Sequence, residues 1–229
     1  MRMFRDFKVV DDVIVDIPFG RILFNRVDLN YVKIVKTLNS STSSKLINLS
    51  TNEFIRLRPK QPSGNTINTY YALVKFSEPI TLLPKSSFVL NLKLPTDLGI
   101  YVKDSLVDTA PLSKVKYSLY GPSDIGDLCR YIDKGIVDST PRDFLGRMHL
   151  TVNSVSDDTI NMSKVVIPID GLAIFVTSEG EIFFNDVSVR ATSQNHFEVS
   201  TRSNASQLHG EITYSSKVKE STYVMRYGA

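Results

Sequence analysis

The single cysteine and the three histidines are the side chains of this chain best suited to nucleophilic or acid–base chemistry. Cys129 is followed by Arg130, whose guanidinium could lower the thiol pKa and give a reactive thiolate. A lone cysteine in a strand-rich chain is more often a small buried hydrophobe, and we favour that interpretation. His149, His196 and His209 share no spacing typical of metal ligands, so we interpret them as surface residues.

Acidic residues occur as short-range pairs, among them Asp124 and Asp127 in a segment flanked by glycines. Such a pair could bind Ca²⁺, but the alternating Asp ladder of a calcium loop is missing. Asp residues in turns more often accept hydrogen bonds from the backbone. The chain also lacks the motifs of serine hydrolases, zinc proteases, redox dithiols and phosphate-binding loops. We therefore expect no catalytic residue, no cofactor and no metal site, with an enzyme on a β scaffold as a remaining alternative.

One segment combines aromatic and basic side chains in a way that could bind nucleic acid. An extended strand would place Phe54, Arg56 and Arg58 on one face, with Lys60 just beyond. Rings can stack on bases and cations can contact phosphates. The whole chain, however, carries a net charge of only +3, and charged side chains also serve to protect strand edges. We interpret this face as solvated and do not expect nucleic acid as a partner.

The segment Lys114–Tyr131, KVKYSLYGPSDIGDLCRY, is the best candidate for an interaction site. Strand alternation at its start places Tyr120 outward, just before a turn at Gly121-Pro122. Tyrosine and arginine are favoured at interaction hot spots. The candidate interaction residues are Tyr117, Tyr120, Arg130 and Tyr131. The same residues would serve equally well to cap a loop with a hydroxyl and to hold loop carbonyls with a guanidinium.

The elements that must position these residues are predicted to be strands. The chain holds 23 Val and 18 Ile but only 6 Ala, a composition that favours β structure. Period-2 alternation recurs between turn signals, and an amphipathic helical pattern is not sustained anywhere. Strands are predicted at Tyr31–Leu38, Phe88–Leu94, Arg147–Val152, Asp186–Ala191, Phe197–Thr201, Ile212–Tyr214 and Tyr223–Tyr227. We interpret Ser123–Phe144 as a long connection with at most one helical turn. The prediction is an all-β fold with antiparallel β-sandwich architecture and little helix.

The domain boundary is predicted near Lys103–Ser113, where the alternation breaks and Pro111 cannot donate to a ladder. This gives an N-terminal sandwich domain at 1–110 and a C-terminal sandwich domain at 111–229, each near the size of one sandwich. The alternative is one continuous sandwich with a long crossover at 121–145.

The same sequence bears on location. One cysteine cannot form an intramolecular disulfide, which suits a reducing compartment. The N-terminal residues contain no apolar core of a signal peptide, and no run of 18 apolar residues occurs. We expect a cytoplasmic protein with no transmembrane segment.

Several segments together resemble a known family. They are Val15–Val27, Leu94–Val102, Ser105–Asp108, KVKYSLYG and LCRY within Lys114–Tyr131, and Ser163–Phe175. The chain resembles, over about residues 15–175, the archaeal family numbered 432 among the domains of unknown function. The resemblance implies no activity, cofactor or catalytic residue, because the family has none assigned. An association of such genes with those of small-conductance mechanosensitive channels would imply an accessory protein, peripheral to a membrane channel.

The leading hypothesis is a non-enzymatic protein-interaction or assembly module that binds a protein partner or associates with itself. It depends on the missing catalytic motifs and on the many strand edges that a partner could extend. The alternative is a small-ligand or carbohydrate-binding β-sandwich in which the four candidate residues line a pocket.

Overall fold

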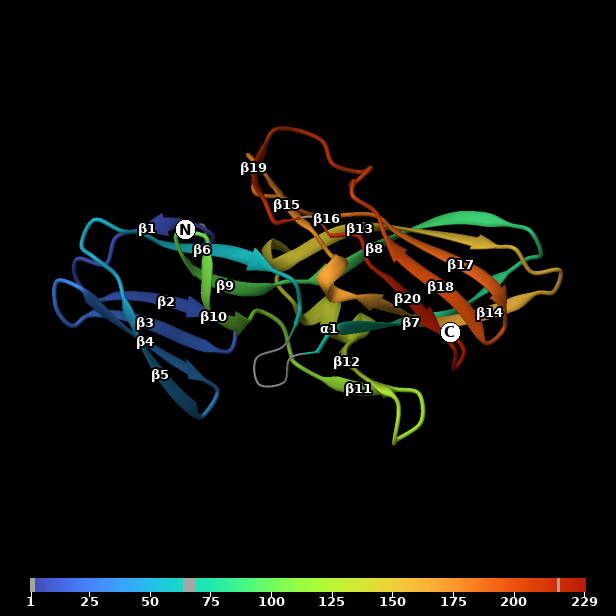
Figure 1. Ribbon diagram of the computed structural model, residues 1–229, viewed down its shortest axis with the longest axis horizontal. Helices are drawn as coiled ribbons and strands as arrows, with labels where there is room; N and C mark the ends of the chain where they lie inside the picture. The colour runs from blue at the N-terminus through green and yellow to red at the C-terminus, as the bar shows by residue number, and fades with distance from the viewer. Residues whose placement is uncertain (1–2, 64–68, 218) are drawn as a thin grey trace. The chain divides into compact units, whose positions relative to one another are not determined.

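The computed structural model describes residues 3–63, 69–217 and 219–229. Strands make up most of the described chain, so the predicted all-β fold is confirmed (Figure 1). Contacts divide the chain into two compact units, which we call unit 1 (residues 1–60 and 97–113) and unit 2 (residues 61–96 and 114–229). The last of the three transitions between the units, after Ser113, falls close to the break in alternation seen in the sequence. Residues 61–96 group with unit 2, whereas the sequence placed them in the first half.

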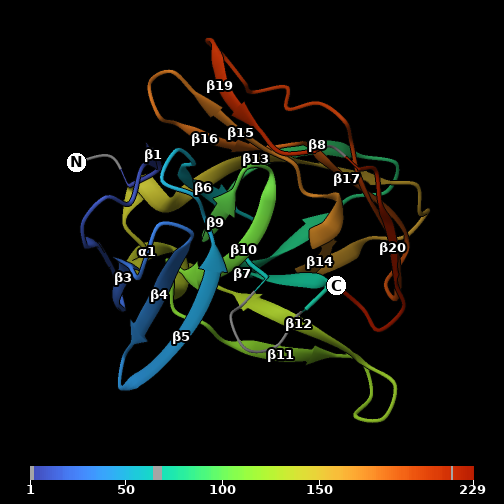
Figure 2. The ribbon, with the colours of Figure 1, turned by 60° about the vertical axis from the view of Figure 1, so that its left-hand side comes forward.

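Unit 1 consists of two antiparallel four-stranded sheets (Figure 2). The first, in the order β2-β3-β4-β5, is a meander of β2 (Val13–Ile17), β3 (Gly20–Arg26), β4 (Tyr31–Leu38) and β5 (Ser41–Asn48). The second, in the order β1-β6-β9-β10, contains β1 (Asp6–Phe7), β6 (Ile55–Lys60), β9 (Asp97–Val102) and β10 (Ser105–Pro111). Strand β4 matches its predicted range residue for residue. Strand β10 is a correction, because we interpreted this part of the chain as a break in the alternation.

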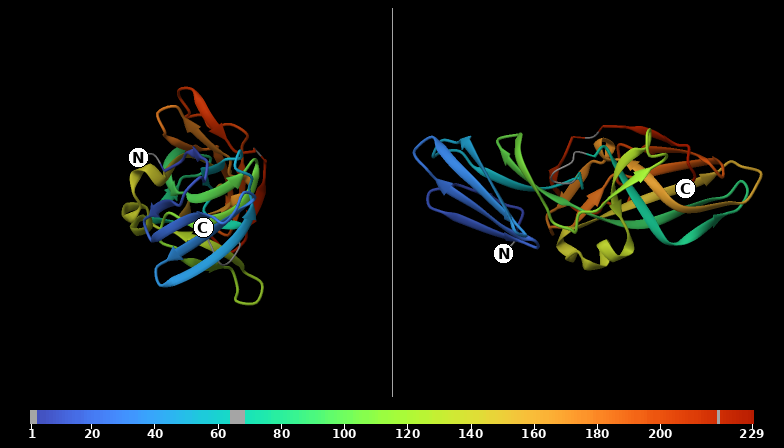
Figure 3. Two further views of the ribbon diagram at one scale, coloured as in Figure 1. Left: turned by 90° about the vertical axis from the view of Figure 1, so that its left-hand side faces the viewer. Right: turned by 90° about the horizontal axis from the view of Figure 1, so that it is seen from below.

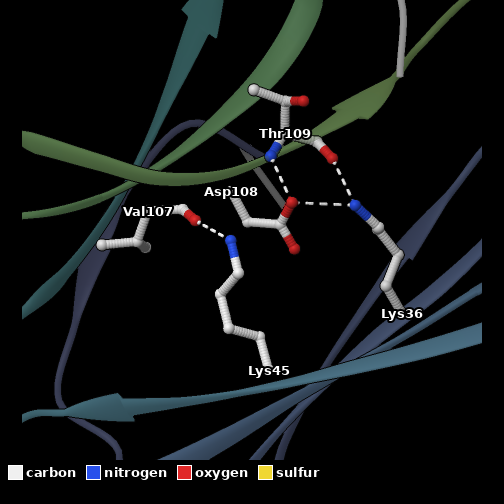
Figure 4. Close-up of polar contacts among 5 residues, drawn as sticks. All are labelled: Lys36, Lys45, Val107, Asp108 and Thr109. Carbon is white, nitrogen blue, oxygen red and sulfur yellow. Dashed lines mark hydrogen bonds and ion pairs between the residues drawn. The ribbon is translucent and has the colours of Figure 1, made fainter. Parts of the chain in front are cut away.

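The core of unit 1 follows from this alternation. On β4, Val32 and Ile34 are fully buried and the side chains between them face outward. Lys36 continues the inward row, so its cationic side chain enters the interior and is only 7% exposed. Its ammonium donates to Asp108 Oδ1 at 2.9 Å and to the carbonyl of Thr109 at 2.7 Å (Figure 4). A buried charge must be paired to be tolerated, and this pair meets that requirement.

Lys45, on the neighbouring strand β5, makes a second tie of the same kind. Its ammonium donates to the carbonyl of Val107 at 2.6 Å (Figure 4). Lys36 and Lys45 therefore connect the meander to backbone carbonyls of β10, the last strand of the second sheet.

Unit 2 contains a small sheet and a large sheet. The small sheet, in the order β11-β12-β7-β14, is formed by β11 (Tyr117–Tyr120), β12 (Asp127–Ile132), β7 (Tyr71–Leu82) and β14 (Ile160–Pro168). The large sheet has eight strands, in the order β19-β15-β16-β13-β17-β18-β20 with β8 also paired to β13. Its strands are β8 (Ser87–Pro95), β13 (Leu145–Ser154), β15 (Ile174–Thr177), β16 (Ile182–Phe184), β17 (Val187–Ser193), β18 (His196–Thr201), β19 (Ile212–Ser215) and β20 (Thr222–Met225).

Both sheets of unit 2 are mixed. β12 runs parallel to β7, and β13 runs parallel to β16 and to β17. We expected the predicted strands to pair in antiparallel fashion. Alternation shows where a strand lies but not which strand it pairs with, so it could not predict these parallel pairs. The inward faces are apolar and fully buried at positions such as Leu150, Val189 and Phe197.

The segment Ser123–Phe144 differs from its interpretation as a connection, because it contains strand β12 and the helix α1 (Lys134–Ser139), the yellow coiled ribbon of Figure 3. Asp133 caps this helix by accepting a hydrogen bond from the amide of Ile136 at 2.8 Å. A 3₁₀ turn at Arg142–Phe144 ends the same segment, and another 3₁₀ turn lies at Ile169–Gly171. Within the described ranges, no helix has the length and apolar character needed to cross a bilayer.

Candidate functional site

A cleft of about 590 Å³ opens on the small sheet of unit 2. Its volume lies within the roughly 300–1,000 Å³ typical of small-molecule sites. All four strands of the sheet contribute to it, together with the turn after β11 and the segment that follows β20. The lining residues are Leu73, Lys75, Ser118, Leu119, Tyr120, Gly121, Pro122, Tyr131, Ser163, Lys164 and Tyr227.

Strand register brings these residues together. Lys75 on β7 lies directly opposite Lys164 on β14, so the two side chains share one face of the sheet. On the other side of β7, Tyr131 of β12 lies opposite Leu73. Alternate residues of a strand share a face, so Leu73 and Lys75 present their side chains on the same surface. The floor of the cleft is therefore built from residues far apart in the sequence.

Tyr120 fixes the segment that closes one side of the cleft. Its hydroxyl donates to the carbonyl of Gly228 at 2.9 Å and accepts from the amide of Tyr227 at 3.0 Å. The rings of Tyr120 and Tyr227 meet edge to face, with centroids 5.7 Å apart. Gly121 has φ +106, and a Cβ there would come within 2.6 Å of the Tyr227 ring. Only glycine fits this turn, because any side chain would displace that wall.

Cations lie close to the tyrosine rings. The ammonium of Lys164 is 5.6 Å from the centroid of Tyr120, and that of Lys116 is 6.0 Å from the centroid of Tyr131. Burial raises the pKa of Tyr120 above its usual value. Burial also raises the pKa of Tyr131, and the nearby charge of Asp133 adds to the effect. Both phenols therefore stay protonated at neutral pH and can donate hydrogen bonds.

The four candidate residues from the sequence do not all converge. Tyr120 and Tyr131 line the cleft, whereas Tyr117 and Arg130 do not. Arg130 is fully buried and donates to the carbonyl of Lys114 at 3.0 Å, so it holds a backbone carbonyl as the structural interpretation proposed. Tyr117 pairs with Arg130 across β11 and β12, on the opposite face from Tyr131.

The predicted outward orientation of Tyr120 is wrong. Tyr120 is 2% exposed, while its neighbour Leu119 is 41% exposed. The reason lies at the far end of the chain, where the ring of Tyr223 packs at 6.3 Å from that of Tyr120. Local alternation could not reveal this partner.

Cys129 is buried, in agreement with its interpretation as a small buried hydrophobe. Burial, helped by the charge of Asp127, raises the pKa of the thiol to about 12. The thiol therefore stays protonated at neutral pH, and the adjacent Arg130 does not produce a thiolate. Asp127 accepts a hydrogen bond from the Tyr223 hydroxyl at 2.5 Å.

Across the residues that the structure describes, no group of three or more His, Cys, Asp or Glu side chains could hold a metal ion.

A histidine–serine contact was missed by the sequence analysis. His149 Nδ1 lies 2.8 Å from Ser206 Oγ, and the Ser206 amide donates to both carboxylate oxygens of Asp186 at 3.1 Å. In a hydrolytic triad the carboxylate orients the imidazole. Here it binds the serine backbone instead, so this contact lacks that orienting bond.

The basic strand face of unit 1 is engaged within its own unit. Arg58 forms an ion pair with Asp6 at 2.6 Å, and Arg56 pairs with Asp104 at 3.3 Å. Lys8 lies 5.2 Å from the Phe54 ring. Arg56 and Arg58, the two arginines that we considered for phosphate contacts, therefore already have acidic partners.

A smaller depression in unit 2, of about 430 Å³, carries both signs of charge. Arg147 on its rim forms an ion pair with Glu181 at 2.8 Å, so part of its charge is balanced internally. This depression contrasts with the cleft on the small sheet, whose described lining includes two lysines and no carboxylate side chain.

The chain belongs to the family described as "Protein of unknown function (DUF432)", whose model matches residues 3–226. The match includes the C-terminal third, beyond the segments in which the sequence showed the resemblance. Comparisons with curated proteins and with solved structures found no match.

Proposed function

We propose that the chain is a non-enzymatic binding protein that holds a small ligand in the cleft of unit 2. The observation that carries the proposal is the cleft itself, because four strands and the C-terminal segment converge on it. Tyr131 and Tyr227 supply ring surface, and Ser118 supplies a hydroxyl donor. The described lining residues carry no carboxylate, imidazole or thiol, so the titratable side chains of the cleft are lysines and tyrosines.

The test is a screen of small aromatic fragments by NMR, with ¹³C-labelled tyrosine rings as the reporter. We expect some fragments to shift the ring signals of Tyr120, Tyr131 and Tyr227 while leaving the exposed Tyr70 unchanged. The variant Tyr131→Ala should weaken binding, and Tyr70→Ala, which lies outside the lining, should not. If no fragment moves the cleft tyrosines, the proposal is wrong.

A second candidate function is binding of a protein partner at the edge of unit 1. β5 lies at the end of its sheet and pairs only with β4 among the described strands. Its charged side chain, Lys45, is engaged with the carbonyl of Val107, and Leu46 is 58% exposed. Natural proteins usually protect such an edge with charge, proline or a bulge, whereas a partner strand can pair with an edge that is left open. A membrane channel's cytosolic domain or a second copy of the chain would both fit this role.

This second candidate is tested by light scattering on the purified chain. We expect a defined oligomer that Leu46→Lys dissociates, because a charge on an edge discourages strand addition. Leu83→Lys changes a leucine of similar exposure in unit 2 and should leave the oligomer intact. A monomer at all concentrations would remove self-association from the candidates.

We further propose a cytoplasmic location and an archaeal source. The support is the lone cysteine, which suits a reducing compartment, and the family to which the chain belongs.

A further inference from the structure

The cleft of unit 2 holds two like charges opposite one another. Lys75 and Lys164 occupy paired positions on β7 and β14, where Cβ atoms are roughly 4.5–5.5 Å apart. Like charges directly opposite on a sheet are destabilising. The ammonium of Lys164 contacts the Tyr120 ring, and Lys75 makes no ion pair with any residue that the structure describes.

Two carboxylates, one on β12 and one just after it, are engaged with other groups. Asp133 lies 3.8 Å from the ammonium of Lys116, and Asp127 is engaged with the Tyr223 hydroxyl. Some lysines elsewhere in the chain have close acidic partners, such as Lys85 with Asp157 at 2.9 Å. The described side chains that line the cleft therefore include two ammonium groups and no carboxylate.

Hydrogen-bond donors and rings line the same cleft as the two lysines. Ser118 contributes a hydroxyl, and the protonated phenol of Tyr131 contributes a second donor. The rings of Tyr131 and Tyr227 offer flat apolar surface beside these donors. Cations and donors suit the oxygens of an anion, while rings suit a planar body attached to it.

We propose that this cleft binds a small oxyanion, a phosphate or a carboxylate, carried on a planar ring, with Lys75 and Lys164 on either side of the anionic group. The inference rests on the proposed ligand-binding function and adds the chemical class of the ligand. Bound between the two ammonium groups, the anion replaces their repulsion with two attractions.

The experiment is isothermal titration of the whole chain with four probes. Phenyl phosphate and benzoate carry the two anionic groups on a ring, phenol is the neutral ring, and inorganic phosphate is the anion alone. We expect one of the ring anions to bind more tightly than phenol and more tightly than inorganic phosphate. The tighter of the two identifies the anionic group.

Two variants and a matched control assign the charge requirement. Lys75→Met and Lys164→Met remove one ammonium each and keep an unbranched apolar stem. Each should weaken binding of the ring anion about tenfold or more, since a charged hydrogen bond is lost. Lys134→Met, an exposed lysine on α1 outside the lining, should leave the affinity unchanged. Circular dichroism of each variant checks that the fold is retained.

The possible outcomes separate this inference from the function on which it rests. If phenol binds as tightly as the ring anions, or if both lysine variants bind like the parent chain, the cleft holds a ligand but not an oxyanion. In that case the inference fails and the ligand-binding function stands. If none of the four probes binds at millimolar concentration, the inference also fails, and the fragment screen then decides the ligand-binding function by itself.

Discussion

Replacing Lys36 by Met should destabilise unit 1 strongly, because it leaves a carboxylate without its cation. The ammonium of Lys36 makes two charged hydrogen bonds, to Asp108 Oδ1 at 2.9 Å and to the carbonyl of Thr109 at 2.7 Å. Each such bond contributes about 1.5–3 kcal/mol. Removing one partner of a buried pair costs about 3–5 kcal/mol.

The structure favours the lower end of that range. Asp108 keeps a hydrogen bond from the amide of Thr109 at 2.8 Å, and its side chain is 18% exposed, so water compensates part of the loss. The methionine side chain fills most of the volume of the lysine stem. We therefore expect the free energy of unfolding to fall by about 3 kcal/mol. Asp108→Asn retains an acceptor for Lys36 and should cost less, about 1–2 kcal/mol.

The assay combines urea unfolding, followed by circular dichroism, with hydrogen exchange of the peptides that contain β4 and β10. Exchange localises the loss to unit 1. Lys45→Met is the matched control, because the side chain of Lys45 is exposed and its ammonium donates to the carbonyl of Val107 where water can replace it, so the loss should be less than about 1 kcal/mol. If Lys36→Met destabilises no more than Lys45→Met does, the buried pair does not stabilise unit 1 and the reasoning is refuted.

Three further predictions concern unit 2. Burial raises the pKa of Cys129 to about 12, so the unfolded chain loses this proton at a lower pH than the folded chain does. The free energy of unfolding should therefore fall as the pH rises above about 9, by up to about 1.4 kcal/mol per pH unit. Cys129→Ala should flatten this slope in urea titrations between about pH 8 and pH 10. Tyr120→Phe removes two hydrogen bonds to the C-terminal segment, so that the amides of 222–229 should exchange faster, with a loss of about 1–2 kcal/mol; unchanged exchange would contradict the proposed anchor. Gly121→Ala strains a residue with φ +106 and pushes on the Tyr227 ring, so it should lower the melting temperature and shift the NMR signal of that ring. The control is Gly210→Ala, at φ +93 but with open space around it, which should shift no NMR signal of the cleft.

The strands were predictable wherever one face is buried and the other is solvated. β4 carries Val32 and Ile34 inward with the exposed Lys33 between them, so alternation was enough to predict this strand. β12 was missed because its central residues, Cys129 and Arg130, are both fully buried. A strand that is buried on both faces loses its alternation, and β12 runs parallel to β7 inside its sheet.

The cleft was only half predictable. Tyr120 and Tyr131 were singled out because their segment is rich in residue types favoured at binding sites. Lys75 and Lys164 were not singled out, because the residues around each of them in the sequence are not of types that indicate a binding site. Their juxtaposition follows from the antiparallel register of β7 and β14, which sequence patterns do not encode over such a separation. Tyr227 was missed because its place beside the cleft depends on a distant residue: its amide donates to the hydroxyl of Tyr120.

Lys36 and Lys75 differ in what surrounds their charge. Lys36 is buried and has a carboxylate at 2.9 Å, so its charge is satisfied within the protein and its removal should weaken the fold. Lys75 is exposed and faces a second cation, so its removal relieves a repulsion and should leave the fold intact or stabilise it slightly. A charge that stabilises nothing inside the protein is kept at the expense of stability, and binding sites are where proteins accept that cost. This difference in environment is the physical reason for assigning Lys36 to structure and Lys75, with Lys164, to the ligand.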